Sequence, residues 1–348
     1  MISLDKNILN KNFAAARRMI EYGNDTPQFI VLPHDKKKSV SLSDHVHVHT
    51  TGGNKFQQLW RLLRLSKKII KKETMVQEFR ILNHRFSGAR AGGGAASAGH
   101  GDGWSITAQD PFFTGLVGWR LSRRYQLPLE IQLHGDFYST NYYKKSGLKH
   151  LFYYHIGKFV LRRADVVRAV GERVRQSIIA LGISPEKISV RPVAVDAAAI
   201  ARYAPRINLH HKYPGYSKIF LALGRLDPVK NISWLIEVFK NISADKLLLI
   251  AGDGSEREKL EKLACSLPNV RLEGWTDDPC SYIKTADAIL FPSLSEGYGL
   301  VPIEAAAAGT PVIMNDAGVA NYELKPGPNV KIIFVADRQA WVDAIRNL

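Results

Sequence analysis

The stretch that decides the fold is Phe291–Pro311, FPSLSEGYGLVPIEAAAAGTP. An apolar strand ends near Phe291, a polar loop follows, and a helix is expected to start near Leu300. Glycines in the loop let the backbone approach a ligand closely. A helix start offers unpaired N–H groups and the positive end of the helix dipole. The stretch therefore predicts a strand–loop–helix unit that is suited to holding a diphosphate.

Two glutamates belong to this unit. Glu296 lies in the loop and Glu304 lies about one turn into the helix, with seven residues between them. One carboxylate can face a ligand from the loop while the other reaches from the helix toward a ribose. The alanine run Ala305–Ala308 favours close packing of the helix on a sheet. The alternative interpretation is a polar loop followed by a solvent-facing glutamate.

A second motif is Leu221–Asn231, LALGRLDPVKN, in which a strand runs into Gly224. Arg225 follows the glycine and Lys230 lies five positions later, so a planar guanidinium and a compact ammonium can face phosphate oxygens together. The alternative is a turn with two exposed cations. The later stretch Ala251–Gly254, AGDG, is a weaker glycine-loop signal of the same kind.

Strands alternate with helices along both halves of the chain, which predicts right-handed βαβ units and parallel sheets. In the second half the expected strands are Lys218–Leu223, Lys246–Ala251, Val270–Leu272, Ala288–Phe291 and Pro311–Met314, and the expected helices are Asn231–Asn241, Ser255–Ala264 and Val301–Ala308. In the first half the expected strands are Phe29–Pro33, Leu129–Leu133, Asp165–Val170 and Ile188–Val193, and the expected helices include Phe56–Lys72 and Leu148–Arg163. Ligands of such sheets bind at the carboxyl ends of the strands.

The 348 residues suggest two domains, and 45% hydrophobic with 23% charged residues is typical of a globular chain. Residues 1–204 hold 32 Lys and Arg against 15 Asp and Glu, whereas residues 205–348 hold 16 against 17. The basic half is expected to face a membrane surface, a phosphorylated acceptor or nucleic acid, unless it is only a solvated face. Two cysteines exclude a disulfide framework, and no apolar run reaches 18 residues.

The first half carries weaker signals. His134 follows a strand, where its imidazole can donate a hydrogen bond to a sugar or leaving-group oxygen, or else be satisfied by local backbone. His45, His47 and His49 alternate with valines and would share one face of a strand, but no carboxylate or cysteine pattern supports a metal site there. The glycine- and alanine-rich stretch Ser87–Gly103 is expected to be a flexible loop.

Taken together, the second-half motifs resemble those of the retaining glycosyltransferases of family 4. The G-R-x(4)-K pattern, the G-D-G turn and the E-x(7)-E motif occur in family order and at family spacing. The residues that carry the resemblance are Gly224, Arg225, Lys230, Gly252, Gly254, Glu296 and Glu304. It is strong over Lys218–Ile313 and weaker over Gln109–Asp196, through QDPF and LHGD.

The resemblance implies the GT-B fold, an α/β architecture of two Rossmann-like domains with parallel sheets facing across a cleft. Residues 1–200 would bind the acceptor, 201–217 would be a linker, and 218–348 would bind a nucleotide-sugar donor. The implied reaction is retaining, metal-independent transfer of a hexose from a nucleotide-diphosphate sugar to a glycan or lipid-linked acceptor, with no cofactor. A front-face mechanism is usually proposed for this family.

The resemblance also implies how the nucleotide is held. Arg225 and Lys230 would hold the diphosphate, while Gly299 and Leu300 would add backbone N–H groups. Glu304 would accept hydrogen bonds from the ribose hydroxyls. The other residues expected to bind the donor are Gly224, Gly252, Gly254, Glu296, Gly297 and Tyr298.

The transferred sugar would be contacted by Glu296 and, from across the cleft, by His134. The residues expected to carry catalysis are Glu296, His134, Arg225 and Lys230. The alternatives are a catalytically impaired sugar-nucleotide-binding protein and a GT-B-like nucleotide-sugar epimerase. A nucleic-acid-binding protein is suggested by the basic half alone and is not expected.

The chain departs from the family pattern in three places. Met1–Leu4 stands where members have a full first strand, Ser87–Gly103 stands where they have another strand, and closing helices are missing after Leu348. A truncated or impaired enzyme is one expectation from these gaps. No secretory signal is visible, so we expect a cytoplasmic protein. A further expectation is docking on the inner face of a membrane through the basic stretch Phe56–Lys72.

Overall fold

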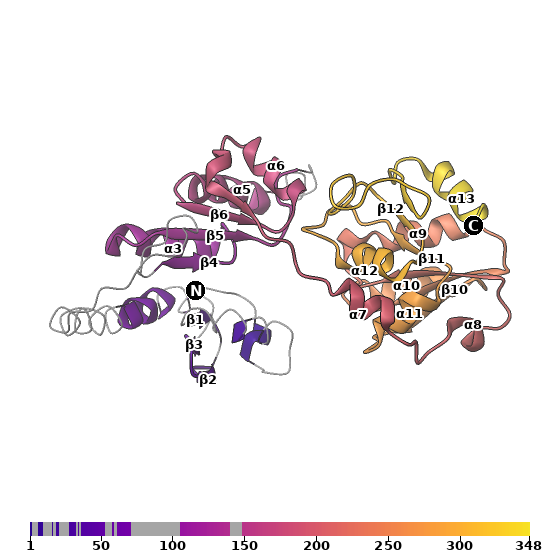
Figure 1. Ribbon diagram of the computed structural model, residues 1–348, viewed down its shortest axis with the longest axis horizontal. Helices are drawn as coiled ribbons and strands as arrows, with labels where there is room; N and C mark the ends of the chain where they lie inside the picture. Colours follow the sequence, from indigo (N-terminus) through magenta and orange to yellow (C-terminus); the bar gives the residue numbers. More distant parts are fainter. Residues whose placement is uncertain are drawn as a thin grey trace. The chain divides into compact units, whose positions relative to one another are not determined.

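The computed structural model describes residues 105–139 and 148–348 continuously (Figure 1). Before residue 105 it describes 1, 6–9, 16, 19–20, 28–32, 34, 36–52, 58 and 61–70. The glycine-rich stretch 87–103 and residues 2–5 lie outside these ranges. The chain divides into two compact units, of which the second comprises His134–Leu151, Ala169–Leu181 and Val190–Leu348, and the first comprises the remainder.

The second unit is built on a six-stranded sheet in which every neighbouring pair is parallel. Its strands, in spatial order, are β10 (Val270–Gly274), β9 (Lys246–Ala251), β8 (Lys218–Leu223), β11 (Ala288–Phe291), β12 (Val312–Met314) and β13 (Val330–Ile332). The continuous apolar runs of β8, β9 and β11 are those of strands covered on both faces. The strand order reverses between β8 and β11, which makes this pair the switch point of the sheet.

Helices supply the cover on both faces of this sheet. Those of the second unit are α6 (Glu172–Ile179), α7 (Ala197–Arg202), α8 (Leu209–Lys212), α9 (Ile232–Phe239), α10 (Arg257–Ala264), α11 (Pro279–Thr285), α12 (Leu300–Ala308) and α13 (Arg338–Arg346), with the 3-10 turn η3 (Pro228–Lys230). One apolar cluster joins α9, α10 and α13 to the sheet, and a second joins α8, α11 and α12 to its other face.

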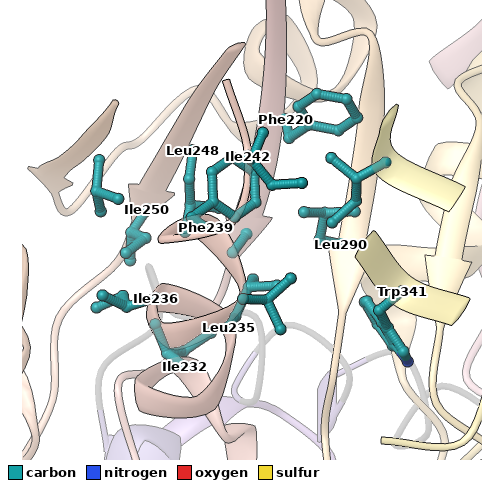
Figure 2. Packing of buried hydrophobic residues seen from close by; sticks show 14 of the residues in the cluster. Phe220, Ile232, Leu235, Ile236, Phe239, Ile242, Leu248, Ile250, Leu290 and Trp341 are labelled. Atoms are coloured by element: carbon teal, nitrogen blue, oxygen red, sulfur yellow. The ribbon is translucent and has the colours of Figure 1, made fainter. Parts of the chain in front are cut away.

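Figure 2 shows the first of these clusters, with Leu235 and Phe239 of α9 packed among Phe220, Leu248 and other strand side chains. The side chain of Trp341 from α13 is fully buried in the same cluster, and its Nε1–H donates to the carbonyl of Ile333 at 3.0 Å. Each buried side chain of this size contributes about 1.5–3 kcal/mol to folding. The sheet that carries the predicted site is therefore rigidly supported.

The first unit contains two smaller sheets and, together with residues at its boundary with the second unit, the remaining helices. A four-stranded sheet has the order β4 (Ile106–Ala108), β5 (Leu129–Leu133), β6 (Val166–Ala169) and β7 (Ile188–Val190), and a three-stranded sheet has the order β1 (Gln28–Leu32), β3 (Val46–Thr50) and β2 (Ser39–Ser43). The helices are α3 (Phe113–Tyr125), α5 (Leu148–Leu161), η1 (Lys6–Leu9) and η2 (Pro185–Lys187), and residues 61–70 are also helical.

Most of the expected elements are present. The predicted strands at 218–223, 246–251 and 288–291 are β8, β9 and β11 with the same bounds. The predicted linker region carries the short helices α7 and α8, and α11, β13 and α13 were not predicted. The α/β class with mainly parallel sheets is confirmed, and an exception among the described strand pairs is the antiparallel pair of β2 with β3. In the described part of the chain, no helix has both the length and the apolar character needed to cross a bilayer.

Candidate functional site

The predicted site residues of the second half gather at the switch point of the six-stranded sheet. The chain leaves β8 through the turn 224–230 and leaves β11 through residues 293–299, which we call loop 293–299. Because β8 and β11 are parallel neighbours, both segments emerge at the same edge of the sheet. Carboxyl ends of strands at a switch point are where open α/β sheets bind ligands.

The turn after β8 presents two cations to one cavity. Arg225 and Lys230 line it together with Phe291 and Ser293 of the neighbouring strand end. The Arg225 side chain is 75% exposed, and its Nη1 lies 3.1 Å from Oδ2 of Asp227. A guanidinium this exposed is held only weakly by its partner and is available to an incoming anion.

Lys230 is held much more closely than Arg225. It ends η3, and its side chain is only 18% exposed. Its Nζ donates to Oε1 of Glu296 at 2.5 Å and lies 5.2 Å from the centroid of the Phe291 ring. The lysine and the loop carboxylate, both predicted site residues, are thus in direct contact.

Glycines make this crowded edge possible. A Cβ on Gly252, whose φ is +147°, would lie 1.8 Å from the carbonyl oxygen of Gly224. A Cβ on Gly254 would lie 2.6 Å from the backbone N and O atoms of Leu226. The AGDG turn after β9 therefore packs backbone to backbone against the turn after β8, which explains why both glycines are needed there.

The start of α12 completes this edge. Gly299 precedes the helix with φ +92°, and none of the described side chains caps the helix start. A Cβ on Gly299 would lie 3.5 Å from the Phe291 ring, the ring whose centroid lies 5.2 Å from Nζ of Lys230, so the helix start and the lysine share this ring as a neighbour. Unpaired N–H groups at such a position favour an anion.

Glu304 lies on the second turn of α12. Burial raises the pKa of its carboxyl, and the described residues provide no hydrogen bond to it. A carboxylate in this state gains from polar donors supplied by a ligand. Tyr298, in loop 293–299, is half-buried, and its pKa is raised first by burial and then by the charge of Glu323.

His134 begins a segment of the second unit that lies against loop 293–299. A Cβ on Gly297 would lie 1.9 Å from the His134 carbonyl oxygen. The hydroxyl of Ser295 donates to the carbonyl of Asp136 at 3.2 Å. Backbone contact thus brings His134, with its exposed side chain, next to the loop that carries Glu296.

The histidines of β3, in the first unit, have serine hydroxyls of the neighbouring strand as partners. His47 and His49 share one face of β3, and their Nδ1 atoms lie 2.7 and 2.9 Å from the hydroxyls of Ser41 and Ser39 on β2. Within the described ranges, no group of three or more His, Cys, Asp and Glu side chains is placed to hold a metal ion.

Loop 293–299 is supported by a further set of contacts that the sequence did not predict. Arg173 of α6 bonds to the segment 316–322, and that segment bonds to the backbone of Tyr298. Gly171 lies directly against the Tyr298 ring. A single arginine in an amphipathic helix carries no sequence signal of such a contact, because the periodicity is that of any surface helix.

Two family models match the chain. Residues 106–199 match the model described as Glycosyltransferase Family 4, and residues 217–348 match the one described as Glycosyl transferases group 1. A curated Escherichia coli relative, UDP-Gal:alpha-D-GlcNAc-diphosphoundecaprenol alpha-1,3-galactosyltransferase, is 31% identical over 180 residues. The match spans 47% of this chain and 46% of that relative, so the chain aligns with less than half of its length.

Solved structures agree on the fold. Sucrose-phosphate synthase from Thermosynechococcus elongatus superposes with a TM-score of 0.72 at 17% identity, over 99% of this chain and 88% of that one. Anabaena HepE in complex with UDP-glucose superposes with a TM-score of 0.69 at 16% identity and the same coverage. These superpositions show the GT-B fold. The two family models show that the chain belongs to the glycosyltransferases of family 4.

Proposed function

We propose that this protein is a retaining glycosyltransferase that transfers a sugar from a nucleotide-diphosphate sugar. The observation that carries the proposal is the gathering of Arg225, Lys230 and the start of α12 at the switch point of one sheet. These groups are positive and converge where the leaving diphosphate would develop its negative charge. Membership of the family supports the same chemistry.

Donor binding in this proposal exchanges partners at Lys230. In the structure its ammonium is neutralised by Glu296. A diphosphate offers stronger acceptors to the ammonium, and the released carboxylate then accepts hydrogen bonds from the hydroxyls of the sugar. Glu304, which has no donor of its own in the described structure, accepts from the ribose. His134 contacts the sugar from its segment beside Gly297.

The proposed transfer proceeds on one face of the sugar. The bond from the anomeric carbon to the diphosphate oxygen breaks, and the acceptor oxygen bonds to the same face of that carbon. The acceptor proton passes to the departing phosphate oxygen, so configuration is retained without an enzyme nucleophile. In this route Glu296, once released from Lys230, stabilises the sugar through hydrogen bonds and forms no bond to the anomeric carbon.

The acceptor in this proposal is a glycan or a lipid-linked sugar. The name of the E. coli relative specifies a diphosphoundecaprenol-linked acceptor for that protein. Proximity to a membrane is supported by α3, whose exposed face carries Leu116, Arg120, Arg123 and Arg124. Helix α3 contains no acidic residue, and these arginines form no ion pair with the described residues. We propose that the protein works in the cytoplasm against the inner face of an anionic membrane.

A donor panel tests the proposal. The full chain is incubated with UDP-glucose, UDP-galactose, UDP-N-acetylglucosamine and GDP-mannose, with and without EDTA, and its melting temperature is measured. A bound ligand at 100 times its Kd stabilises the native state by about 2.7 kcal/mol. We expect one donor to raise the melting temperature with EDTA present. If none does, the proposal fails.

Turnover separates the enzyme from its alternatives. Release of the nucleoside diphosphate, with the α configuration of the donor kept in the first product formed, supports a retaining transferase. Binding without any turnover indicates an impaired sugar-nucleotide-binding protein. Conversion of the donor into its epimer indicates an epimerase.

A further inference from the structure

Arg173 makes an unusually complete set of contacts for a residue in the first turn of a short helix. Its Nε donates to the carbonyl of Gly318 at 2.9 Å, and its Nη2 donates to the carbonyl of Ala320 at 2.9 Å. Nη2 also forms an ion pair with the Asp316 carboxylate, and the guanidinium carbon lies 5.1 Å from the Tyr322 ring centroid. The side chain is 13% exposed, and all these residues belong to the second unit.

The segment that Arg173 holds is in direct contact with loop 293–299. The N–H of Val319 donates to the carbonyl of Tyr298 at 2.8 Å. A Cβ on Gly318 would lie 2.1 Å from the Tyr298 carbonyl oxygen and 2.9 Å from Cβ of Glu296. The backbone of the segment therefore forms the wall against which Glu296 and Tyr298 are placed.

The start of α6 also contacts loop 293–299 directly, without the segment 316–322 in between. A Cβ on Gly171 would lie 3.1 Å from Cδ2 of Tyr298. The N–H of Glu172 donates to the Glu323 carboxylate at 3.1 Å, just after the held segment. Gly171 and Glu172, at the start of α6, thus contact the Tyr298 ring and the Glu323 carboxylate directly.

We infer that Arg173 is a positioning residue for Glu296, acting through segment 316–322. A guanidinium fork that donates to two carbonyls and a carboxylate fixes a backbone in one conformation. This inference rests on the proposed function, in which Glu296 contacts the transferred sugar. The sugar portion of the donor therefore depends on Arg173 more than the nucleotide portion, which Arg225, Lys230 and Glu304 hold.

The experiment compares Arg173→Gln and Arg173→Lys with a matched control, Arg175→Gln. Arg175 lies on the same helix and pairs only with Glu172 among the described residues, at 2.9 Å, so its loss leaves segment 316–322 untouched. Hydrogen exchange of the full chain without ligand reports on the Val319 amide. Calorimetric titration measures the Kd of UDP-galactose and of UDP, and likewise of GDP-mannose and of GDP. The difference within each pair reports on the sugar portion, and the diphosphate alone reports on the nucleotide portion.

We expect Arg173→Gln to speed exchange at Val319 at least tenfold and to weaken the intact donor about tenfold more than the matching diphosphate. Arg173→Lys restores neither the slow exchange at Val319 nor the donor affinity, because an ammonium cannot span three acceptors. Arg175→Gln behaves as wild type in both measurements. Unchanged exchange at Val319, or equal losses for donor and diphosphate, overturns the inference. Asp316→Asn, which keeps the shape of the segment, replaces Arg173→Gln if that variant does not fold.

The two proposals fail in different ways. If the wild-type chain binds none of the four donors of the panel, the proposed function fails, while exchange at Val319 still decides whether Arg173 positions the segment 316–322. If wild type binds a donor and Arg173→Gln binds it equally well, only the role of Arg173 is lost.

Discussion

Lys230 and Glu296 lie 66 positions apart in the chain, and Nζ of the lysine is 2.5 Å from Oε1 of the glutamate. Both side chains are largely shielded from water, at 18% and 14% exposure. Each therefore depends on the other for charge compensation while no ligand is present. The pair keeps both groups at the switch point of the sheet, where the proposed donor would exchange partners with them.

Removal of one partner is expected to destabilise the protein. Lys230→Met leaves Glu296 with an uncompensated, shielded charge, which costs about 1–3 kcal/mol. The double variant Lys230→Met/Glu296→Gln removes that charge and is expected to recover most of the lost stability. Urea unfolding of the four proteins in this cycle measures the coupling. Additive losses in the double variant would show that the pair is not coupled.

Donor affinity is expected to depend on pH through Glu304. Burial holds its pKa above the usual value, and hydrogen bonds from ribose hydroxyls favour the charged form. Affinity therefore falls as the pH drops through that raised pKa, and Glu304→Gln gives a weaker and flatter profile. The measurement is the donor Kd between pH 4 and 8, and a wild-type profile as flat as that of the variant contradicts the assignment.

The same substitution has a predicted effect on stability. A carboxyl with a raised pKa in the folded state stabilises fully below its unfolded pKa, about 4.3, and loses that contribution as the pH rises through the folded pKa. Glu304→Gln without ligand is therefore expected to match or exceed the wild-type melting temperature at pH 7, although it binds donor poorly. A lower melting temperature would mean that the carboxylate has a structural partner.

The glycine at 252 is expected to tolerate no side chain. Gly252→Ala places a Cβ 1.8 Å from the Gly224 carbonyl at a φ of +147°, so the turns after β8 and β9 must separate. We expect a loss of about 2–4 kcal/mol and weaker diphosphate binding. Gly215→Ala is the matched control, since nothing lies within 4 Å of its added Cβ. Equal stability of the two variants would contradict the packing described for this edge.

Membrane docking is expected to depend on the exposed face of α3. Arg120→Glu/Arg123→Glu/Arg124→Glu reverses three charges that form no ion pairs with described residues. We expect co-sedimentation of the wild type with vesicles containing 30% acidic phospholipid at low salt, at least a fivefold reduction in the variant, and no binding to neutral vesicles. Identical sedimentation of variant and wild type would remove α3 from the docking surface.

Much of this architecture is readable from the sequence. Short apolar runs such as Lys218–Leu223 and Lys246–Ala251 favour strands covered on both faces, and they are β8 and β9. The meeting of Lys230 with loop 293–299 also follows from the pattern, because carboxyl ends of parallel strands share one edge. The short β13 escaped prediction, since its three half-buried residues have no alternation to detect.

The contacts that set the fine geometry are not readable in this way. The Gly252–Gly224 approach depends on two turns that are distant in sequence, and no spacing rule connects them. In the sequence, Arg173 cannot be distinguished from other cations of amphipathic helices, and only the structure shows its hydrogen bonds to the segment 316–322. Such contacts are decided by tertiary packing, which local sequence patterns do not encode.

The central claim is that Arg225, Lys230 and the start of α12 hold a pyrophosphate. Calorimetric titration of the wild type and of Lys230→Met with UDP, UMP, GDP and GMP tests it most directly. We expect the wild type to bind one diphosphate at least tenfold more tightly than its monophosphate, and Lys230→Met to lose most of that difference. Equal affinities for diphosphate and monophosphate in the wild type, or a preference untouched by Lys230→Met, would contradict it.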